Sequence, residues 1–338
     1  MVNQKSVTII GSDQTDRVVR AMARSDAALW AESAIKLPGG AAFSFRRHVY
    51  QIEPLSIWGP RETTRKATQG GFTLVYILKA LWALIHGKAP QGVIYLFPTD
   101  DKVGLFSQSR FTPLIDANPF SLGAHMRRTN NVHLKQVGSA MLFFAGGQLP
   151  HRVQGLDPES VALRSDPADV IVEDEKDLMD PAVTAKARGR LGHSTLKLEI
   201  DLSNPTIPHY GVDLTWQASD QRHWMVRCQA CNEWWCLEIE FPQILQRRPD
   251  GRVIRACLKC GRELDIDAGE WVPKYPERSR VHVGRWWSQL NSHYVDPATI
   301  LAEWNDPPEG NVADVHRLRL GLPYLDAQHG LSPVDVLL

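Results

Sequence analysis

The 338-residue sequence lacks any apolar run of about eighteen residues, which is the length that a membrane-spanning helix needs. Its polar N-terminus also lacks the apolar core of a secretory signal peptide, so we expect neither membrane insertion nor export by that route. Net charge is absent as well, because 38 Lys and Arg residues balance 38 Asp and Glu residues. The balance hides an excess of basic residues up to residue 165 and of acidic residues after it, which allows a basic working face on the first half.

Nothing in the sequence repeats, and no low-complexity tract interrupts it. With 43% hydrophobic and 22% charged residues, the chain is ordinary for a globular protein and long enough for a large α/β core with a smaller module. Apolar patterns predict helices over residues 15–35, 73–86, 99–117 and 181–189, and strands over 93–97, 132–137, 140–145, 170–172 and 196–202. Residues 36–62 are rich in Pro, Gly and aromatics and are expected to be irregular. The alternation of strands and helices from about residue 65 to 205 predicts a mostly parallel sheet with crossover helices.

The apolar segment 170–172 is followed directly by Glu173, Asp174 and Glu175. An apolar stretch of this kind predicts a buried central strand, and its carboxyl end lies at the edge where open α/β sheets bind ligands. In nucleotide hydrolases the first of two such acids holds Mg²⁺ and the second polarises the attacking water. Asp174 and Glu175 are the candidates for these two roles. The alternative is a strand that continues into a solvated acidic loop.

A loop over residues 66–73 reads Lys-Ala-Thr-Gln-Gly-Gly-Phe-Thr and precedes the apolar segment that is expected to be a buried helix. Gly70 and Gly71, which follow Gln69, allow backbone amides to turn towards an anion, and the helix N-terminus adds its dipole. Thr73 could bind Mg²⁺ through its hydroxyl group. These residues predict a phosphate-binding loop, although a Gly-Gly turn that leads into a core helix would have the same pattern.

The loop departs from the standard phosphate-loop pattern, G-x-x-x-x-G-K-[ST]. Phe72 stands where that pattern has its lysine, and the only lysine of the loop, Lys66, is at its start. A lysine there could still reach the β- and γ-phosphates from the other side. Lys66 would then neutralise the phosphate charge that develops during hydrolysis.

All five cysteines lie between residues 228 and 260. Cys228 and Cys231 form one C-x-x-C pair, and Cys257 and Cys260 form a second. Two such pairs predict a tetrahedral site with four sulfur ligands, and zinc is the metal that this site prefers. Because protein fills all four positions, we expect the zinc to be structural. Cys236 is left over and is expected to be a small buried apolar residue.

The residues after each cysteine pair also suit a metal-binding knuckle. Gly261 permits the tight turn after the second pair, and Asn232 tolerates left-handed geometry after the first. The zinc would either fold a small ribbon or place Trp234, Trp235 and nearby Arg residues against DNA or a protein partner.

Together, the loop at 66–73, the acidic strand and several flanking segments resemble the large terminase subunit of tailed bacteriophages, in its lambda-like branch. The resemblance covers about residues 45–325 in order. The flanking segments that carry it are Tyr50-Gln51, 163–165, 203–208 with 210–211, 219–231 and 320–324.

The resemblance implies roles for further residues. Tyr50 and Gln51 would hold adenine, although they would equally suit a packed aromatic ring beside a surface amide. Ser203 and Asn204 would sense the γ-phosphate, or else form a turn before a proline. Arg164 would act as an arginine finger or, as often, form a structural salt bridge.

The family implies a fold and a function. The fold would be a P-loop NTPase core of the RecA or helicase type, with a mostly parallel sheet, flanking helices and a small zinc-ribbon module. The function would be ATP hydrolysis, with Mg²⁺, that drives double-stranded DNA into a procapsid. Partners would be the portal protein and the small terminase subunit, with the chain in a homo-oligomeric ring when docked. We would then expect it in the host cell cytoplasm and transiently on the portal, but not in the mature virion.

The resemblance also divides the chain. We expect an N-terminal helical segment (1–45), the ATPase core (46–221), a zinc-ribbon insertion (222–275) and a C-terminal helical segment or linker (276–338). The family's nuclease domain would begin where this sequence ends, so we do not expect nuclease activity from this chain.

Two features bear on competing functions. The Phe72 substitution favours a nucleic-acid-binding zinc-ribbon protein with an inactive loop, whereas Lys66 and the acidic pair favour an active motor. The pairs Arg46-Arg47 and Arg127-Arg128 are candidates for contacts with DNA phosphates, although such pairs are more often simply solvated.

Overall fold

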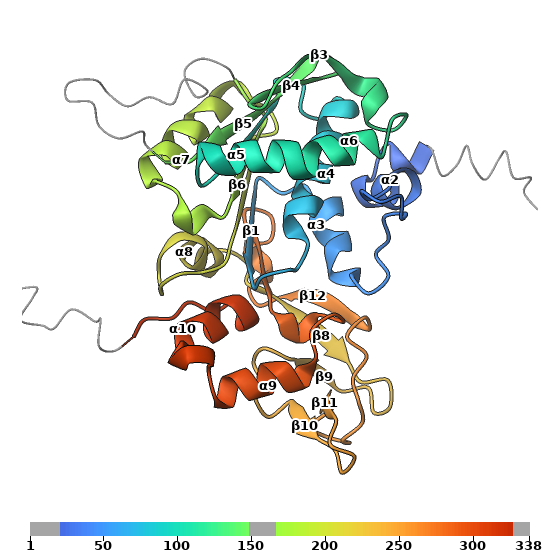
Figure 1. The fold of residues 1–338 in the computed structure, drawn as a ribbon, viewed down its shortest axis with the longest axis vertical. Helices are drawn as coiled ribbons and strands as arrows, with labels where there is room; N and C mark the ends of the chain where they lie inside the picture. Colours follow the sequence, from blue (N-terminus) through green and yellow to red (C-terminus); the bar gives the residue numbers. More distant parts are fainter. Residues whose placement is uncertain (1–20, 149–166, 327–338) are drawn as a thin grey trace, which may run out of the picture.

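A mixed sheet of eleven strands organises the chain in the computed structural model, which describes residues 21–148 and 167–326 (Figure 1). Its order is β12-β8-β13-β1-β7-β6-β2-β5-β4-β3, with β9 paired to β8. Neighbours from β8 through β5 run parallel, and β12, β9, β4 and β3 pair antiparallel. The strands are β1 (Arg61–Lys66), β2 (Val93–Phe97), β3 (Met126–Asn130), β4 (Leu134–Val137), β5 (Ala140–Gly146), β6 (Val170–Asp174), β7 (Leu198–Ser203), β8 (Arg222–Arg227), β9 (Trp234–Cys236), β12 (Gly269–Pro273) and β13 (Val283–Trp287), with β10 (Leu245–Arg247) and β11 (Val253–Arg255) in a separate hairpin.

Helices cover both faces of this sheet. Tyr95 of β2 belongs to the larger core, which includes most of α4, whereas Ile94 and Leu96 belong to a second core under α7. Alternate residues of one strand therefore reach opposite layers. The helices are α2 (Ala27–Ala34), α3 (Ile52–Ser56), α4 (Phe72–Ile85), α5 (Asp100–Phe106), α6 (Thr112–Asp116), α7 (Pro181–Arg188), α8 (Gly211–Ala218), α9 (Pro297–Asn305) and α10 (Val312–Asp314). The mostly parallel α/β fold that the sequence predicted is confirmed.

Apolar periodicity correctly located five strands, β2, β4, β5, β6 and β7, and the helices α4, α5, α6 and α7. The helix expected over residues 73–86 is α4, and the acidic strand is β6, with all five of its residues buried. α7 begins as its sequence predicts, because Pro181 opens the helix and Asp180 accepts a hydrogen bond from the Ala182 amide at 2.7 Å. The helix expected over 15–35 is interrupted in the described chain, because residues 21–23 are helical, a turn follows, and α2 begins at Ala27; residues 15–20 lie outside the described residues.

The sequence predicted no strand over residues 61–66, where the structure has β1. Residues 36–62 were expected to be irregular, and residues 66–73 to form the loop. The strand reads Arg-Glu-Thr-Thr-Arg-Lys, yet it lies in the middle of the sheet between β13 and β7 and is almost wholly buried. It contains no apolar residue, so hydrophobic periodicity could not detect it. Its neighbour β13 was also missed.

Each buried side chain of β1 has at least one hydrogen-bond partner, on a covering helix, a neighbouring strand or a loop. On the α4 side, Glu62 accepts hydrogen bonds from Lys79 and Arg285, and the Thr64 hydroxyl lies 2.6 Å from that of Tyr76. On the other side, Arg65 donates to Asp213 of α8 at 2.6 Å and lies over the Trp216 ring. A central strand of this composition is stable because paired charges avoid the cost of unpaired burial.

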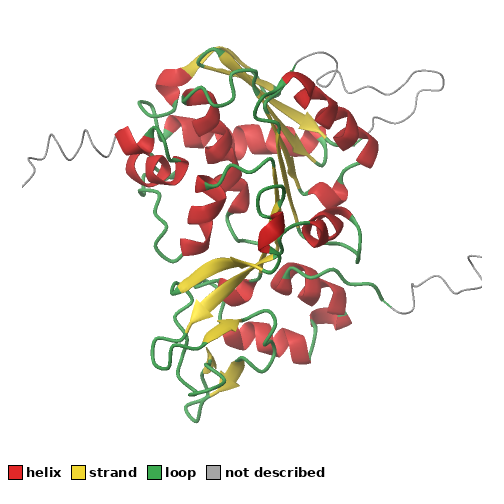
Figure 2. Cartoon of the chain, turned by 180° about the vertical axis from the view of Figure 1, so that it is seen from behind, coloured by secondary structure: helices red, strands yellow, loops and turns green. Residues whose placement is uncertain are grey.

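The cysteine-containing segment continues the sheet instead of standing apart from it (Figures 1 and 2). β8 precedes Cys228, pairs with β13 in parallel and carries both β9 and β12 as antiparallel neighbours. α9 packs on the β10–β11 hairpin, where the Phe241 and Trp304 rings meet edge to face at 5.0 Å. The domain limits at 222 and 275 remain a prediction. Among the described residues, no helix has the length and apolarity to cross a bilayer.

A buried histidine behind β1 makes stability depend on pH. His282 is 6% exposed, its Nε2 lies 2.8 Å from the Thr63 hydroxyl, and burial, with the nearby Arg61 charge, lowers its pKa to about 4. The unfolded chain, with a histidine pKa of about 6.5, therefore binds this proton more readily than the folded chain. The stabilisation is present above pH 6.5 and is lost as the pH falls towards 4.

We predict that His282→Gln flattens the pH dependence of the free energy of unfolding between pH 6.5 and 4, by up to about 1.4 kcal/mol per pH unit. Urea unfolding at several pH values measures the slope. The exposed His209→Gln should keep the wild-type slope. Identical profiles for His282→Gln and wild type would show that this histidine does not titrate on unfolding.

Candidate nucleotide site and metal centre

The ends of β1, β7 and β6 bring the predicted loop and the acidic pair together. These three strands are neighbours and parallel, so their carboxyl ends lie at one edge of the sheet. Lys66 ends β1 and Asp174 ends β6, with Glu175 immediately after it. Lys66 Nζ donates to Glu175 Oε1 at 2.7 Å across 109 positions of sequence. The cation and the acids therefore converge on one place.

Some backbone amides of the loop after β1 are hydrogen-bonded, and others have no partner among the described residues. The amides of Ala67 and Thr68 donate to the carbonyl oxygens of Trp287 and Leu318, at 2.9 and 3.1 Å. No hydrogen bond engages the amides of residues 69–71 within the described chain, and the first amides of α4 are free of helical partners, as at every helix start. Unpartnered amides at a glycine loop and a helix start are donors of the kind that binds phosphate.

Both glycines of the loop are required by close contacts. A Cβ on Gly70 would lie 2.8 Å from ring atoms of Phe72 and Trp287, and one on Gly71 would lie 2.6 Å from the Gln51 amide nitrogen. Gly71 also has a φ of 74°, and Gln69 before it has 65°. This left-handed backbone turns the amides outward and favours glycine.

Phe72, which replaces the usual lysine, belongs to the hydrophobic core. It is 1% exposed, and its ring lies 5.7 Å from that of Tyr50 and 5.8 Å from that of Trp287. Lys66 is thus the loop's own candidate for a phosphate-binding cation.

Tyr50 and Gln51 are hydrogen-bonded to the loop through their side chains. The Tyr50 hydroxyl and the Gln51 amide both donate to the Gly70 carbonyl, at 3.2 and 2.8 Å. Both residues are nearly buried, and Tyr50 packs among aromatic rings. Their contact with adenine stays a prediction, while their observed effect is to hold the loop's shape.

Asp174 is suited to a cation. Tyr95 donates to its Oδ2 at 3.0 Å, while its Oδ1 is buried without a hydrogen-bond partner among the described residues. Burial raises the pKa of Asp174 to about 6, and nearby Lys66 and Thr73 oppose that rise. A bound divalent ion would keep the carboxylate charged and satisfy the unpaired oxygen. Asp174 and Thr73 therefore fit Mg²⁺.

Glu175 sits in strained backbone at the centre of the site. Its φ of 63° and ψ of 48° place a non-glycine residue in the left-handed region, which occurs disproportionately at functional sites. Besides Lys66, its carboxylate faces the Ser203 hydroxyl at 3.5 Å and the Asn204 amide at 3.4 Å. The Asn204 side chain donates to the carbonyl oxygens of Lys66 and Arg317, at 3.0 and 3.3 Å. Ser203 and Asn204 thus both touch the acid, and Asn204 also touches the start of the loop.

Two residues around the site have supporting roles that the sequence did not predict. Asp177 accepts hydrogen bonds from the amides of Thr206 and Val212, at 2.8 and 2.7 Å, and so fixes the segment after Asn204. Gln289 donates to both the carbonyl and the hydroxyl oxygen of Thr68. No local pattern marks either role, because each depends on residues distant in sequence. Arg164, the predicted arginine finger, lies outside the described residues.

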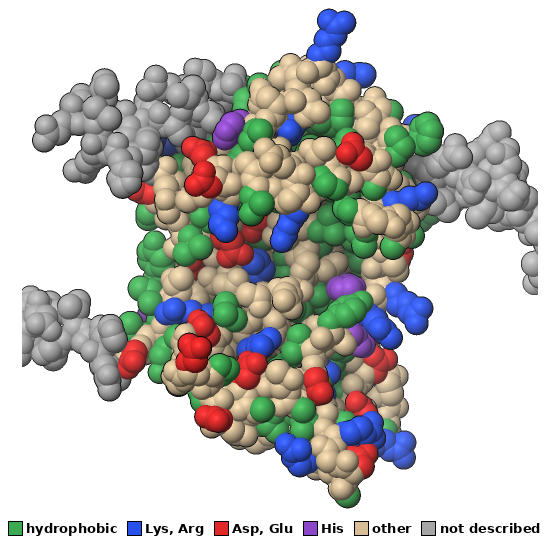
Figure 3. Space-filling view, in the orientation of Figure 1, with side chains coloured by type: hydrophobic (Ala, Val, Ile, Leu, Met, Phe, Trp, Pro, Cys, Tyr) green, Lys and Arg blue, Asp and Glu red, His purple; other side chains and the backbone are tan. Residues whose placement is uncertain are grey.

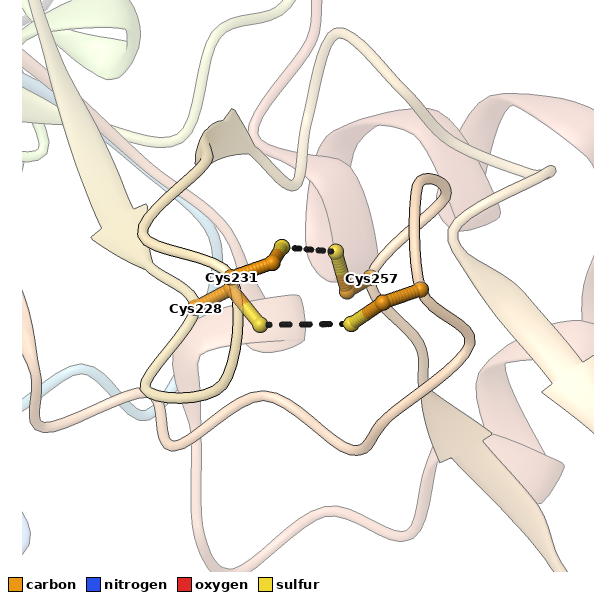
Figure 4. Close-up of side chains that lie close together, drawn as sticks. Cys228, Cys231 and Cys257 are labelled. Carbon is orange, nitrogen blue, oxygen red and sulfur yellow. Dashed lines mark hydrogen bonds between the residues drawn. The ribbon is translucent and has the colours of Figure 1, made fainter.

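The four paired cysteines converge in one cluster that could hold a metal ion (Figure 4). Their sulfur atoms all lie within 4.8 Å of one another, with Cys228 and Cys260 at 3.7 Å and Cys231 and Cys257 at 3.5 Å. Zn–S bonds of about 2.3 Å in tetrahedral geometry place sulfurs about 3.8 Å apart, so this arrangement fits zinc. Cys236 is buried outside the cluster, where its thiol contacts Glu238.

The backbone after each pair has the geometry that the sequence predicted. Asn232 has a φ of 62° and Gly261 a φ of 72°. Their amides donate to the carbonyl oxygens of Cys228 and Cys257, at 2.9 and 2.7 Å, which closes each knuckle. Both expectations about these turns are confirmed.

A glycine loop follows β1, and an acidic pair stands at the end of β6, two strands away in the parallel sheet. The Lys66 side chain lies between the loop and the acids. This arrangement defines a P-loop ATPase. The chain belongs to the phage terminase family: the model for "Phage terminase large subunit gpA, ATPase domain" matches residues 41–286. The resemblance seen in the sequence is thereby confirmed.

Two solved structures are similar to the chain. The ATPase domain of the Thermus phage P74-26 large terminase is 9% identical, with 83% of this chain and 97% of that chain covered and a TM-score of 0.44. A variant of that domain with one arginine replaced by alanine is 10% identical, with the same coverage and a TM-score of 0.42. No curated protein sequence matches the chain.

We predict that the purified protein contains one zinc per chain and that Cys231→Ser loses it. Loss of the metal should remove about 2 kcal/mol or more of stability, which corresponds to a fall of about 4–8 °C in Tm. Elemental analysis and thermal unfolding measure both quantities. Cys236→Ala is the matched control and should keep its zinc. A wild-type protein without zinc, whose Tm is unaffected by a chelator, would contradict the assignment.

Proposed function

We propose that this chain is the ATP-hydrolysing subunit of a viral DNA-packaging motor and that it translocates duplex DNA into a procapsid. Membership in the terminase family supports the type of motor. The observation that carries the proposal is the contact of Lys66 with Glu175 beside the free amides of the loop. That contact supplies, in one place, a cation for phosphate and a carboxylate for water.

The residues of the site divide the work of hydrolysis. The amides of Gln69, Gly70 and Gly71 bind phosphate oxygens, while Thr73 and Asp174 hold Mg²⁺. The bound ion supplies positive charge against the phosphates. Lys66 adds the protein's own charge, and its position at the end of a buried strand keeps that charge in place.

The ion pair also keeps the water-activating carboxylate of Glu175 engaged until ATP binds. In this arrangement the Glu175 carboxylate is held by Lys66 and lies near Ser203 and Asn204, so it is engaged by protein groups. The γ-phosphate carries more negative charge than one carboxylate and competes for the lysine. Glu175 is then released to orient the attacking water. Ser203 contacts Glu175, Asn204 contacts both Glu175 and the Lys66 carbonyl, and together they report the loss of the γ-phosphate.

The remaining assignments follow the family. Tyr50 and Gln51 are proposed to lie near the bound nucleotide, and Arg164 to stabilise the transition state from its own or a neighbouring subunit. The partners are double-stranded DNA, the portal protein and the small subunit, with the chain in a ring on the procapsid in the host cytoplasm. The zinc is structural, and the division of the chain at 46–221 and 222–275 is retained.

A second function is favoured by one observation. Phe72 fills the usual lysine position with a buried ring, which would suit a nucleic-acid-binding zinc-ribbon protein whose loop is inactive. Measured turnover separates the two proposals.

We predict that Glu175→Gln lowers kcat for ATP hydrolysis by about 100-fold or more without weakening ATP binding, because the group that activates water is lost and the γ-phosphate no longer has to displace a carboxylate from Lys66. Lys66→Ala should weaken binding and turnover together. DNA-stimulated phosphate release and nucleotide titration measure these effects, and exposed Lys102→Ala is the control.

Unchanged turnover in Lys66→Ala would exclude the proposed loop. No turnover by the wild-type protein, even with portal and small subunit present, would favour the inactive-loop alternative.

Exposed arginine pairs are proposed to contact DNA phosphates. Arg127 and Arg128 lie on the edge strand β3, and Arg46 and Arg47 are exposed before α3. Basic and acidic side chains are interspersed on the face shown in Figure 3, so local pairs of arginines are better candidates than a broad basic field.

We predict that replacing Arg127 and Arg128 with alanine weakens binding of duplex DNA uniformly across sequences and reduces the slope of log K against log salt by about 2. Fluorescence anisotropy at several salt concentrations measures the slope. Arg24→Ala controls for the loss of a surface charge elsewhere. An unchanged slope in the double variant would remove these arginines from the DNA interface.

A further inference from the structure

The Glu175 side chain lies on a face of the sheet that strand alternation does not predict. At the end of β6, Glu173 accepts from Arg188 of α7 on one face, and Asp174 accepts from Tyr95 on the other, in the core under α4. Successive residues of a strand face opposite sides. If β6 continued regularly by one residue, the Glu175 carboxylate would therefore lie beside Glu173, away from the loop.

The observed carboxylate is on the Asp174 side instead. Its partner Lys66 ends β1 two residues after Thr64, whose hydroxyl contacts α4. The backbone at Glu175 is left-handed, with a φ of 63° and a ψ of 48°. This turn breaks the alternation and brings the water-activating group to the face where the loop and Asp174 lie.

The next side chain, Lys176, takes the face that Glu175 leaves. Its Nζ donates to Glu173 Oε2 at 2.5 Å and to Asp201 Oδ1 at 2.9 Å. The two carboxylates are opposite each other in the register of β6 and β7, and each is 1% exposed. Lys176 itself is only 10% exposed. Its ion pairs therefore close the turn over Asp174 and Glu175 from behind.

Other cations contact the same carboxylates without belonging to the turn. Arg188 donates to both oxygens of Glu173, at 3.2 and 3.1 Å, and Arg61 of β1 donates to Asp201 at 3.2 Å. Loss of any one of these cations leaves buried negative charge with fewer partners and should lower stability. Arg188 thus shares the structural role of Lys176 but is anchored on α7.

We propose that Lys176 is a positioning residue for ATP hydrolysis, because its ion pairs with two buried carboxylates hold the turn that places Glu175 beside the loop. The inference rests on the proposed function of Glu175 as the group that orients the attacking water. Left-handed backbone is unfavourable for a residue with a side chain, so contacts around it must maintain it. Without the lysine, the turn loses its side-chain anchor and the carboxylate its fixed place.

The activity test compares Lys176→Met with Arg188→Met, which removes a different cation from the same carboxylate. We expect Lys176→Met to lower kcat for ATP hydrolysis by about tenfold or more without raising KM for ATP, because the group that it misplaces acts in the chemical step. Lys176→Arg keeps a cation at this position and should retain kcat to within about threefold. Arg188→Met should keep kcat to within about two-fold, although its Tm falls.

Hydrogen exchange measures the turn itself and requires no turnover of ATP. The Glu175 amide donates to the Leu202 carbonyl at 2.8 Å, so its exchange reports whether the turn is closed. Exchange of this amide should be about tenfold faster in Lys176→Met and should change by no more than about two-fold in Arg188→Met. Thermal unfolding confirms that each variant is folded. Lys176→Gln, which keeps a hydrogen-bond donor, repeats both measurements at a smaller cost in stability.

A double variant tests whether the lysine acts through the acid. In the Glu175→Gln background, Lys176→Met should lower single-turnover hydrolysis by no more than about two-fold further, since the group that it positions is already lost. A full additional loss of tenfold would show that Lys176 acts elsewhere.

The possible failures are distinct. Unchanged kcat in Lys176→Met, or an equal fall of kcat in Arg188→Met, would overturn the positioning role. Unchanged exchange of the Glu175 amide in Lys176→Met would overturn it even in a protein that does not hydrolyse ATP. Wild-type turnover that survives Glu175→Gln would instead overturn the proposed function of that acid.

Discussion

The fold depends on a central strand made of charged and hydroxyl side chains, each of which must meet a partner from a different element. β1 alternates between Glu62 and Thr64, which face α4, and Thr63 and Arg65, which face β7, α8 and His282. A shift of one residue would leave several charges buried without partners, which costs far more than a slipped apolar strand. The register of β1 is therefore strictly specified. Because Lys66 ends that strand, the same constraint places the site's cation.

The sequence was a good guide wherever burial follows apolar residues, and a poor guide to β1 for the opposite reason. α4, β2 and β6 are rich in apolar residues, and their ends were found to within a residue or two. β1 is buried through ion pairs and hydrogen bonds to residues as far away as Arg285, and such pairing leaves no periodic trace. β13 was missed although it is buried, because its mixture of Gly, Arg and Trp has no simple period.

The candidate site shows the same division between local and distant information. The cysteine centre is set by two short spacings and a turn after each, so its ligands could be named from the sequence. The loop and the acidic pair could also be named, but not their separation, because that follows from the insertion of β7 between β1 and β6. The supporting contacts of Gln289, Leu318 and Asp177 are wholly tertiary and were out of reach.

The continuity of β8 with the main sheet has a mechanical consequence. β1 pairs with β13, β13 pairs with β8, and β8 ends one residue before Cys228. Backbone pairing thus connects the loop's own strand to the strand that leads into the first knuckle. A tilt of the strand that carries Lys66 is therefore expected to move the cysteine module with it.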